Sequence, residues 1–149
     1  MSETPPEESP PIESPSILVS TKAALGVAQD DASFDGEILT FINSALAEVH
    51  QVGIGPEEGL MIFSASDEWE ALIGTDSRLN LVKAYVYLYV KILFDPPEIG
   101  FVLTSMERIL ERHIWRLMVA VDKPPIVVEI DILPDEPLPE NPLGNIVVL

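Results

Sequence analysis

The sequence contains no cysteine and few basic residues. Its 149 residues include 8 lysines and arginines against 25 acidic residues, which gives a formal net charge of −17. The absence of cysteine excludes a disulfide-stapled fold, a thiolate zinc site and a cysteine nucleophile. The shortage of lysine and arginine argues against general affinity for nucleic acid, because binding a polyanion requires clustered positive charge.

Long apolar runs and targeting segments are also missing. The longest apolar stretch, residues 79–94, covers 16 residues and is interrupted by Asn80, Lys83 and Lys91. A bilayer-spanning helix needs about 20 apolar residues, so we expect no transmembrane helix and no membrane partner. The N-terminal residues lack the positive charge and the apolar core of a secretory signal. We therefore expect the newly made protein to be located in a cytoplasm.

Proline and charge divide the chain into three parts. Residues 1–16 hold five of the 14 prolines, residues 123–149 hold six, and both segments are acidic. Such segments cannot bury enough apolar surface to fold alone. We predict an acidic, proline-rich N-terminal arm over 1–16 and a proline-rich, extended C-terminal arm over 123–149. The 106 residues of the central part, 17–122, can form one modest hydrophobic core.

Helical periodicity dominates the first half of this central part. A short amphipathic run over 16–25 ends at Gly26, and a longer one from Ile38 to Val49 ends at Gly53. A surface loop over 53–66 is expected next, with a short extended piece at 60–63. Ser66 is a candidate cap for the brief helical turn that follows.

The second half predicts a helical hairpin. Residues 76–95 are apolar on nearly all sides, which is typical of a buried central helix. Asp95-Pro96-Pro97 breaks the chain, and residues 101–122 again show helical spacing. The sequence thus predicts a mainly α fold, a small helical bundle built on a long antiparallel hairpin. Aromatic packing between its two helices is expected from Tyr85, Tyr87, Tyr89 and Trp115.

Beyond the central part, the apolar period changes to two. A strand is predicted over residues 126–133, and it must pair with the 60–63 loop, a neighbouring subunit or a partner's sheet edge, because a lone strand is unstable. Its alternating faces hold Ile126, Val128, Ile130 and Ile132 on one side and Val127, Glu129, Asp131 and Leu133 on the other.

A calcium site is one chemical hypothesis. Residues 31–38 match the first eight positions of an EF-hand loop, with Asp31, Ser33 and Asp35 at alternate ligand positions. The twelfth position is Ile42, where a bidentate glutamate is required. A helix-entry turn capped by Ser33 or Asp35 is therefore favoured.

Other catalytic and ligand-binding patterns are weak. The glycine-rich residues 53–59 include two glutamates that would repel a phosphate. His50 and His113 fall on separate predicted helices, with no third histidine for zinc. Glu68 and Glu70 lie in a highly charged segment without signs of the desolvation that acid catalysis needs. We expect no cofactor, no metal and no enzymatic activity.

Basic residues gather on one predicted helix. Arg108, Arg112 and Arg116 are three of only eight basic residues and recur every four positions. Glu107 and Glu111 partly compensate them. A solvated, salt-bridged face and a docking stripe for an acidic surface, such as the next copy of the protein, are both open.

A second candidate contact lies on the central helix. A spacing of two directs Tyr87 away from Tyr85 and Tyr89, toward the face that carries Lys83 and Lys91. Core packing is the default for these aromatic residues. Tyr87, flanked by the two lysines, is the best candidate among them for a contact between subunits.

Taken together, residues 17–122 resemble the phage head-tail connector proteins of the gp6-like type, which are adaptor or head-completion proteins. The resemblance is carried by FDGEILTFINSALAEVHQVGIGPEEG, the DEWEALIG turn, LVKAYVYLYVKILFDPP and FVLTSMERILERHIWRLMV. It includes the order and length of the helices and centres on the break at residues 94–97. The two arms depart from the family pattern.

The resemblance implies a non-enzymatic subunit of a ring, typically of twelve copies, beneath the portal of a tailed bacteriophage. Expected partners are its own copies, the portal protein and a head-closure, stopper or tail protein. The expected location is the virion neck, after a period in the host cytoplasm. DNA is expected to cross the lumen without specific binding.

The residues fit this expectation. A closed ring needs two different faces that meet head to tail, and acidic walls would repel passing DNA. Residues 126–133 could join a sheet edge of the portal or of a neighbour. The alternative is an acidic helical adaptor module that binds a basic partner protein through its tails.

Overall fold

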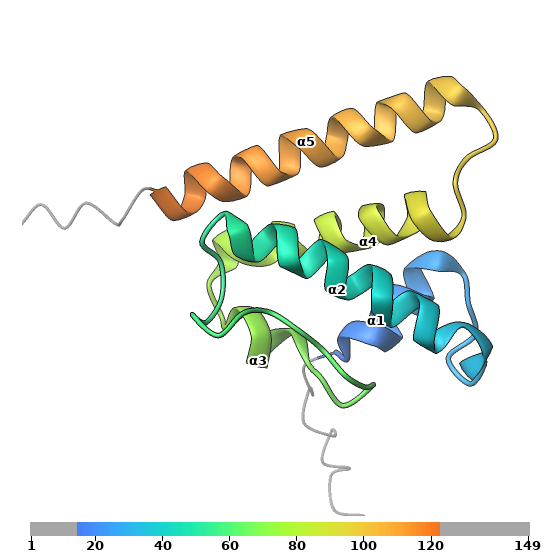
Figure 1. Cartoon of the computed structure of the whole chain (residues 1–149), viewed down its shortest axis with the longest axis horizontal. Coiled ribbons are helices and arrows are strands. Elements are labelled where there is room, and N and C mark those ends of the chain that lie inside the picture. The colour runs from blue at the N-terminus through green and yellow to red at the C-terminus, as the bar shows by residue number, and fades with distance from the viewer. Residues whose placement is uncertain (1–14, 123–149) are drawn as a thin grey trace, which may run out of the picture.

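The structure, a computed structural model, describes residues 15–122 (Figure 1). As predicted, this part is mainly α and contains no strand, only an isolated bridge between Ser16 and Glu68. The predicted strand over 126–133 lies outside the described residues. The helices are α1 (Ile17–Leu25), α2 (Asp35–Gln51), α3 (Trp69–Ile73), α4 (Leu81–Phe94) and α5 (Gly100–Asp122), with 3₁₀ turns at Ala32–Phe34 and Ser77–Asn80.

Helix α4 is central, as its nearly all-round apolar sequence predicts. It contacts α1 and α2 on one side and α5 on the other, and α4 and α5 run antiparallel as the predicted hairpin (Figure 1). Its buried residues are Val82, Tyr85, Val86 and Val90. On α2 the buried residues recur at helical spacing, as Ile38, Ile42, Ala45, Leu46 and Val49. Burial of these two faces forms most of the core.

Helix ends follow the sequence signals only in part. Gly26 ends α1 in the left-handed region with φ 77°, as predicted. Ser66 does not cap α3: Glu68 is the capping residue and makes no side-chain hydrogen bond to the helix. The stretch predicted as one helix from residue 76 opens with a 3₁₀ turn instead, where the Asp76 carboxylate accepts from the backbone N–H of Arg78 at 2.9 Å.

The turn into α2 is organised by a buried lysine. The Lys22 side chain is only 2 % exposed, and its ammonium donates to Gln29 O at 3.1 Å, Asp31 O at 2.7 Å and Asp35 Oδ1 at 2.7 Å. Asp31, rather than Ser33 or Asp35, caps the turn, since its carboxylate accepts from Ser33 N at 3.0 Å. The calcium-like loop therefore surrounds the ammonium of the chain's own lysine.

The loop between α2 and α3 is fixed by one side chain. Asn43 of α2 donates from Nδ2 to Ile62 O at 2.9 Å and accepts at Oδ1 from Ile62 N at 2.9 Å, as a neighbouring strand would. Leu60 and Ile62 are buried while Met61 and Phe63 are exposed, which is the alternation expected for an extended piece.

Replacing Asn43 by alanine is expected to lower the free energy of unfolding by about 2 kcal/mol, because both backbone groups of Ile62 lose their partner in a half-buried site. Urea denaturation followed by circular dichroism measures the change. Thr40→Ala, which removes a hydroxyl bonded only to its own helix at Gly36 O, is the control and should change stability by less than about 0.5 kcal/mol. Equal effects of the two variants would contradict the role of Asn43.

Candidate functional site

Helix α5 carries six exposed large apolar side chains. Leu117 is its only buried residue, and Leu110 and Ile114 pack partly against the core. The prediction that Trp115 packs inside the hairpin is wrong, since Trp115 is 58 % exposed. The exposed large apolar residues of this helix, together called the outer apolar set, are Phe101, Val102, Ile109, Trp115, Met118 and Val121. Surface of this kind commonly marks a contact with another protein.

The three arginines predicted from their spacing form a stripe on the exposed side of α5. Arg108, Arg112 and Arg116 are all exposed, and none forms an ion pair with a residue that the structure describes. The stripe is thus a solvated face without ion pairs to described residues, and its use as a docking surface stays a prediction. We call these residues the arginine stripe.

A groove of about 360 Å³ runs along the side of the α4–α5 hairpin that faces α2. Its rim carries the carboxylates of Glu48, Glu107 and Glu111, and its apolar lining comes from Tyr85, Tyr89, Leu110 and Ile114. We call it the acidic groove. None of its three carboxylates has a basic partner among the described residues. Glu48 could not be assigned to this groove from the sequence, because it lies on α2, which a loop and two other helices separate from α5.

Hydrogen bonding inside the acidic groove links α4 to α2. The Tyr85 hydroxyl donates to Glu48 Oε2. Burial first, and then the hydrogen bond to Glu48, raise the pKa of Tyr85 above its usual value. Burial and the same carboxylate also raise the pKa of Tyr89. Both hydroxyls are therefore neutral at physiological pH.

Replacing Tyr85 by phenylalanine is expected to lower the free energy of unfolding by about 2 kcal/mol at neutral pH, because a hydrogen bond to a charged acceptor is lost. The raised pKa adds a pH signature. Above about pH 10 the unfolded chain loses the tyrosine proton before the folded chain does, so wild-type stability falls with rising pH, and this part of the fall disappears in Tyr85→Phe.

Urea denaturation from about pH 7 to about pH 11 measures both effects. Tyr87→Phe is the matched control, because the Tyr87 hydroxyl forms no hydrogen bond with a described residue. Identical pH profiles for wild type and Tyr85→Phe would contradict the link between Tyr85 and Glu48.

A second groove of about 360 Å³ lies on the opposite side of the hairpin, toward α1. Tyr87, Lys91, Ile109 and His113 line it, together with Ala24, Ala84 and Leu88. Burial first, and then the charges of Arg116 and Arg112, lower the pKa of His113. Both arginines are neighbours of His113 on α5, at the preceding position and one turn further along. The two sides of the hairpin therefore differ in charge.

The predicted contact residues of α4 are partly engaged within the chain. The ring of Tyr87 packs edge-on against Trp69 with centroids 5.9 Å apart, and Lys83 lies over the same indole at 6.0 Å. Lys91 forms an ion pair with Asp95. As predicted, these residues share one side of α4, and through the second groove Tyr87 and Lys91 come close to the basic side of α5.

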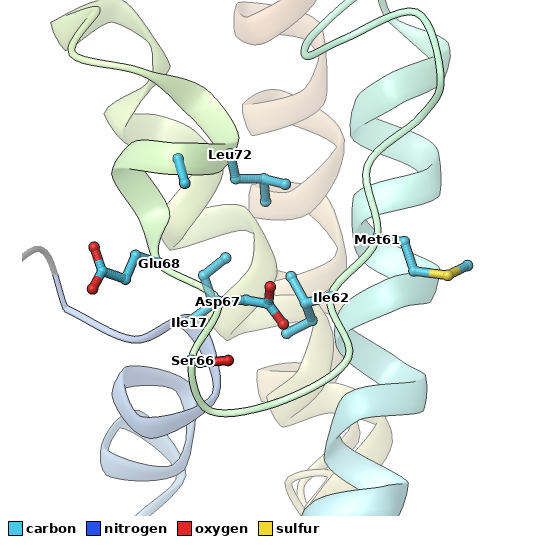
Figure 2. Close-up of a pocket in the computed structure, with 8 residues that line it drawn as sticks. Ile17, Met61, Ile62, Ser66, Asp67, Glu68 and Leu72 are labelled. Atoms are coloured by element: carbon cyan, nitrogen blue, oxygen red, sulfur yellow. The ribbon is translucent and has the colours of Figure 1, made fainter.

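A third hollow, of about 420 Å³, lies between the start of α1, the extended loop and α3. Figure 2 shows Ile17, Ile62 and Leu72 around it, while the Met61 side chain points away. Among its polar lining residues, Asp67 is engaged within the chain, since its Oδ2 accepts from Phe63 N at 2.8 Å and from Ser64 N at 2.9 Å. The Asp67 carboxylate therefore holds the loop at residues 63 and 64.

Two negative findings apply to residues 15–122. No group of three or more histidine or acidic side chains is arranged to hold a metal ion. None of the helices in this range combines the length and apolar character that crossing a membrane requires. Exposed apolar and charged surface along α5 is thus the candidate functional feature of the described chain.

Comparison with known proteins agrees with this picture. A family model described as phage connector protein matches residues 17–124, which is 108 of the 149 residues and includes all five helices. No curated protein and no solved structure matches the chain.

Proposed function

The chain belongs to the phage connector protein family, and from this premise we propose that it forms a ring beneath the portal of a tailed bacteriophage. Membership makes it a structural protein of the virion head–tail region rather than an enzyme. In the proposed ring, each copy binds its neighbours, the portal on one side and a head-closure, stopper or tail protein on the other. The ring extends the channel through which DNA leaves the head.

The observation that carries this proposal is the outer apolar set of α5. Phe101 is 81 % exposed and Trp115 is 58 % exposed, and the remaining members lie along the same helix. An isolated soluble subunit gains nothing from presenting six large apolar side chains on one helix, whereas a subunit that is covered by neighbours buries them. The chain also exposes Met61 and Phe63, on the loop that lies across α2 and α4 from α5 (Figure 1).

The charge of the chain supports the conduit role. With a net charge of −17, a ring of copies repels a passing polyanion instead of binding it. The arginine stripe is then better suited to binding a protein than to binding DNA.

The double variant Phe101→Gln with Trp115→Gln tests the ring proposal. Glutamine is a good helix former, so the variant is expected to keep its thermal stability. It should bind its own copies and the portal of the same phage at least roughly tenfold more weakly, since each exposed aromatic anchor is worth 1 kcal/mol or more at an interface. Analytical ultracentrifugation and electron microscopy of portal complexes measure the loss.

Leu93→Gln is the control, because Leu93 is an exposed apolar residue of α4 rather than α5. It should assemble as wild type does. A wild-type chain that stays monomeric, ignores the portal and binds an unrelated basic protein would favour the acidic adaptor instead.

The C-terminal arm is proposed to attach the ring. The alternating sequence of residues 126–133 suits addition to a sheet edge of the portal or of a neighbour. Deleting residues 124–149 is expected to abolish co-sedimentation with portal rings while the helical core keeps its circular dichroism spectrum and melting temperature. Unchanged attachment of the truncated chain would contradict this use of the arm.

A further inference from the structure

The two sides of the α4–α5 hairpin carry opposite charge. On the side toward α2, the acidic groove presents Glu48, Glu107 and Glu111. On the exposed side of α5, extending toward the second groove, lies the arginine stripe, Arg108, Arg112 and Arg116. Neither group has an ionic partner in the described chain. Unpaired arginines are unexpected in a protein whose 25 acidic residues far outnumber its 8 basic residues.

We propose that the arginine stripe of one copy docks into the acidic groove of the next copy. This inference rests on the proposed ring and names the contact that closes it. The contact is heterologous, since one subunit contributes α5 arginines and its neighbour contributes a groove built from α2, α4 and α5. Such a contact leaves one free stripe and one free groove on every dimer, so it continues from copy to copy until a ring closes.

The groove has the chemistry that an arginine side chain fits. Its apolar lining by Leu110, Ile114 and the two tyrosine rings can cover the aliphatic stem, and an aromatic face can stack with a planar guanidinium. The rim carboxylates can accept its N–H groups in pairs. Lysine would satisfy the charge but not the stacking and paired hydrogen bonds.

The positions of the charges on α5 set the direction of assembly. Glu107 and Glu111 lie one turn apart on the side of the helix that faces Glu48, whereas Arg112 and Arg116 are exposed helix neighbours of His113, which lines the second groove. Trp115 lies on the exposed surface of the same helix. A neighbour that docks on the stripe can therefore also cover part of the outer apolar set.

Charge reversal tests this contact with the full chain. The stripe variant carries Arg112→Glu and Arg116→Glu, the groove variant carries Glu107→Arg and Glu111→Arg, and a combined variant carries all four changes. Each of the first two should weaken self-association by roughly tenfold or more. The combined variant should recover most of the loss, because the complementary charges are restored between copies.

Net charge is controlled by a fourth variant. It joins the stripe changes to Glu57→Arg and Glu58→Arg, which are exposed loop positions, so its net charge equals that of the wild type, as does that of the combined variant. It should not recover assembly. Native mass spectrometry and electron microscopy report the oligomers, alone and with purified portal, and circular dichroism reports folding.

The outcomes separate the contact from the function. If wild type assembles and the stripe and groove variants assemble equally well, the inferred contact is wrong and the ring proposal stands. If the fourth variant recovers as fully as the combined one, net charge rather than this contact controls assembly, and the inference again fails. If wild type forms no oligomer with or without portal, the ring proposal itself fails.

Discussion

Replacing Trp69 by alanine is expected to lower the free energy of unfolding by about 4 kcal/mol, the value typical of a large aromatic residue removed from a core. Trp69 is 1 % exposed, and its indole Nε1 donates to Ser20 Oγ at 2.9 Å. Its ring also packs edge-on against Tyr87 of α4. The side chain thus joins α3 to α1 and α4, and its loss leaves a cavity where the three helices meet.

Urea denaturation followed by circular dichroism measures the effect, and the melting temperature should fall by roughly 15 °C or more for a domain of this size. Trp69→Phe keeps much of the volume but loses the indole hydrogen bond, so it should cost roughly half as much. Trp115→Ala is the matched control, because it removes the same side chain from an exposed position. A cost below about 1 kcal/mol for Trp69→Ala would show that Trp69 does not hold these helices together.

These two tryptophans show where sequence reasoning stops. The pattern of α4 predicts burial correctly, because a helix that is apolar nearly all round has no other stable location. The apolar pattern of α5 predicts a helix and where it begins and ends, but it does not predict how much of the helix is buried. Its apolar positions cover more of the circumference than α4 alone can contact, since α1 and α2 occupy the other side of α4. Trp115 therefore stays exposed although a core position was expected.

Local capping was predicted less well than helix content. Ser66 and Asp76 both precede helical turns and both have suitable side chains, yet only Asp76 caps its turn. The difference is tertiary: residues 67–69 pair with residues 15–17, through Ile17 N to Asp67 O at 2.9 Å and the bridge between Ser16 and Glu68. That pairing sets where α3 begins, and no local pattern around Ser66 reports it.

The candidate contact surface also has one part that the sequence predicts and one part that it does not. Spacing alone identified the arginine stripe, because residues four apart share a helix face. The acidic groove required the fold, since Glu48 meets Glu107 and Glu111 only after α2 packs on the α4–α5 hairpin. A charged face on one helix can thus be predicted from the sequence. An oppositely charged groove formed by several helices cannot be predicted in this way.

The turn before α2 leads to the second large expected effect. Replacing Lys22 by methionine is expected to lower the free energy of unfolding by about 3 to 5 kcal/mol, the range for removing one partner of a buried ion pair. Methionine keeps most of the side-chain volume, so the loss reports the ammonium. Three oxygens, Gln29 O, Asp31 O and Asp35 Oδ1, lose their donor, and water reaches a 2 % exposed site poorly.

Lys83→Met is the matched control, because Lys83 is half-exposed and approaches only the face of Trp69 at 6.0 Å. It should cost less than about 1 kcal/mol. Denaturation by urea at neutral pH compares the two variants directly. Equal costs would mean that the three oxygens around Lys22 find other partners.

A double-mutant cycle then locates the loss in the charge pair. Asp35→Asn alone removes the carboxylate that, among the described residues, pairs with the Lys22 ammonium. Combined with Lys22→Met, it leaves neither charge behind. The combined variant should be more stable than the sum of the single losses implies, by about 1 to 3 kcal/mol, because residues in one hydrogen-bond network are not additive. If the two single losses simply add, Lys22 stabilises the fold through its hydrogen bonds to the two backbone carbonyl groups rather than through Asp35. In either case the positive charge inside this turn belongs to the chain, since the Lys22 ammonium contacts the backbone oxygen of Asp31 and the carboxylate of Asp35.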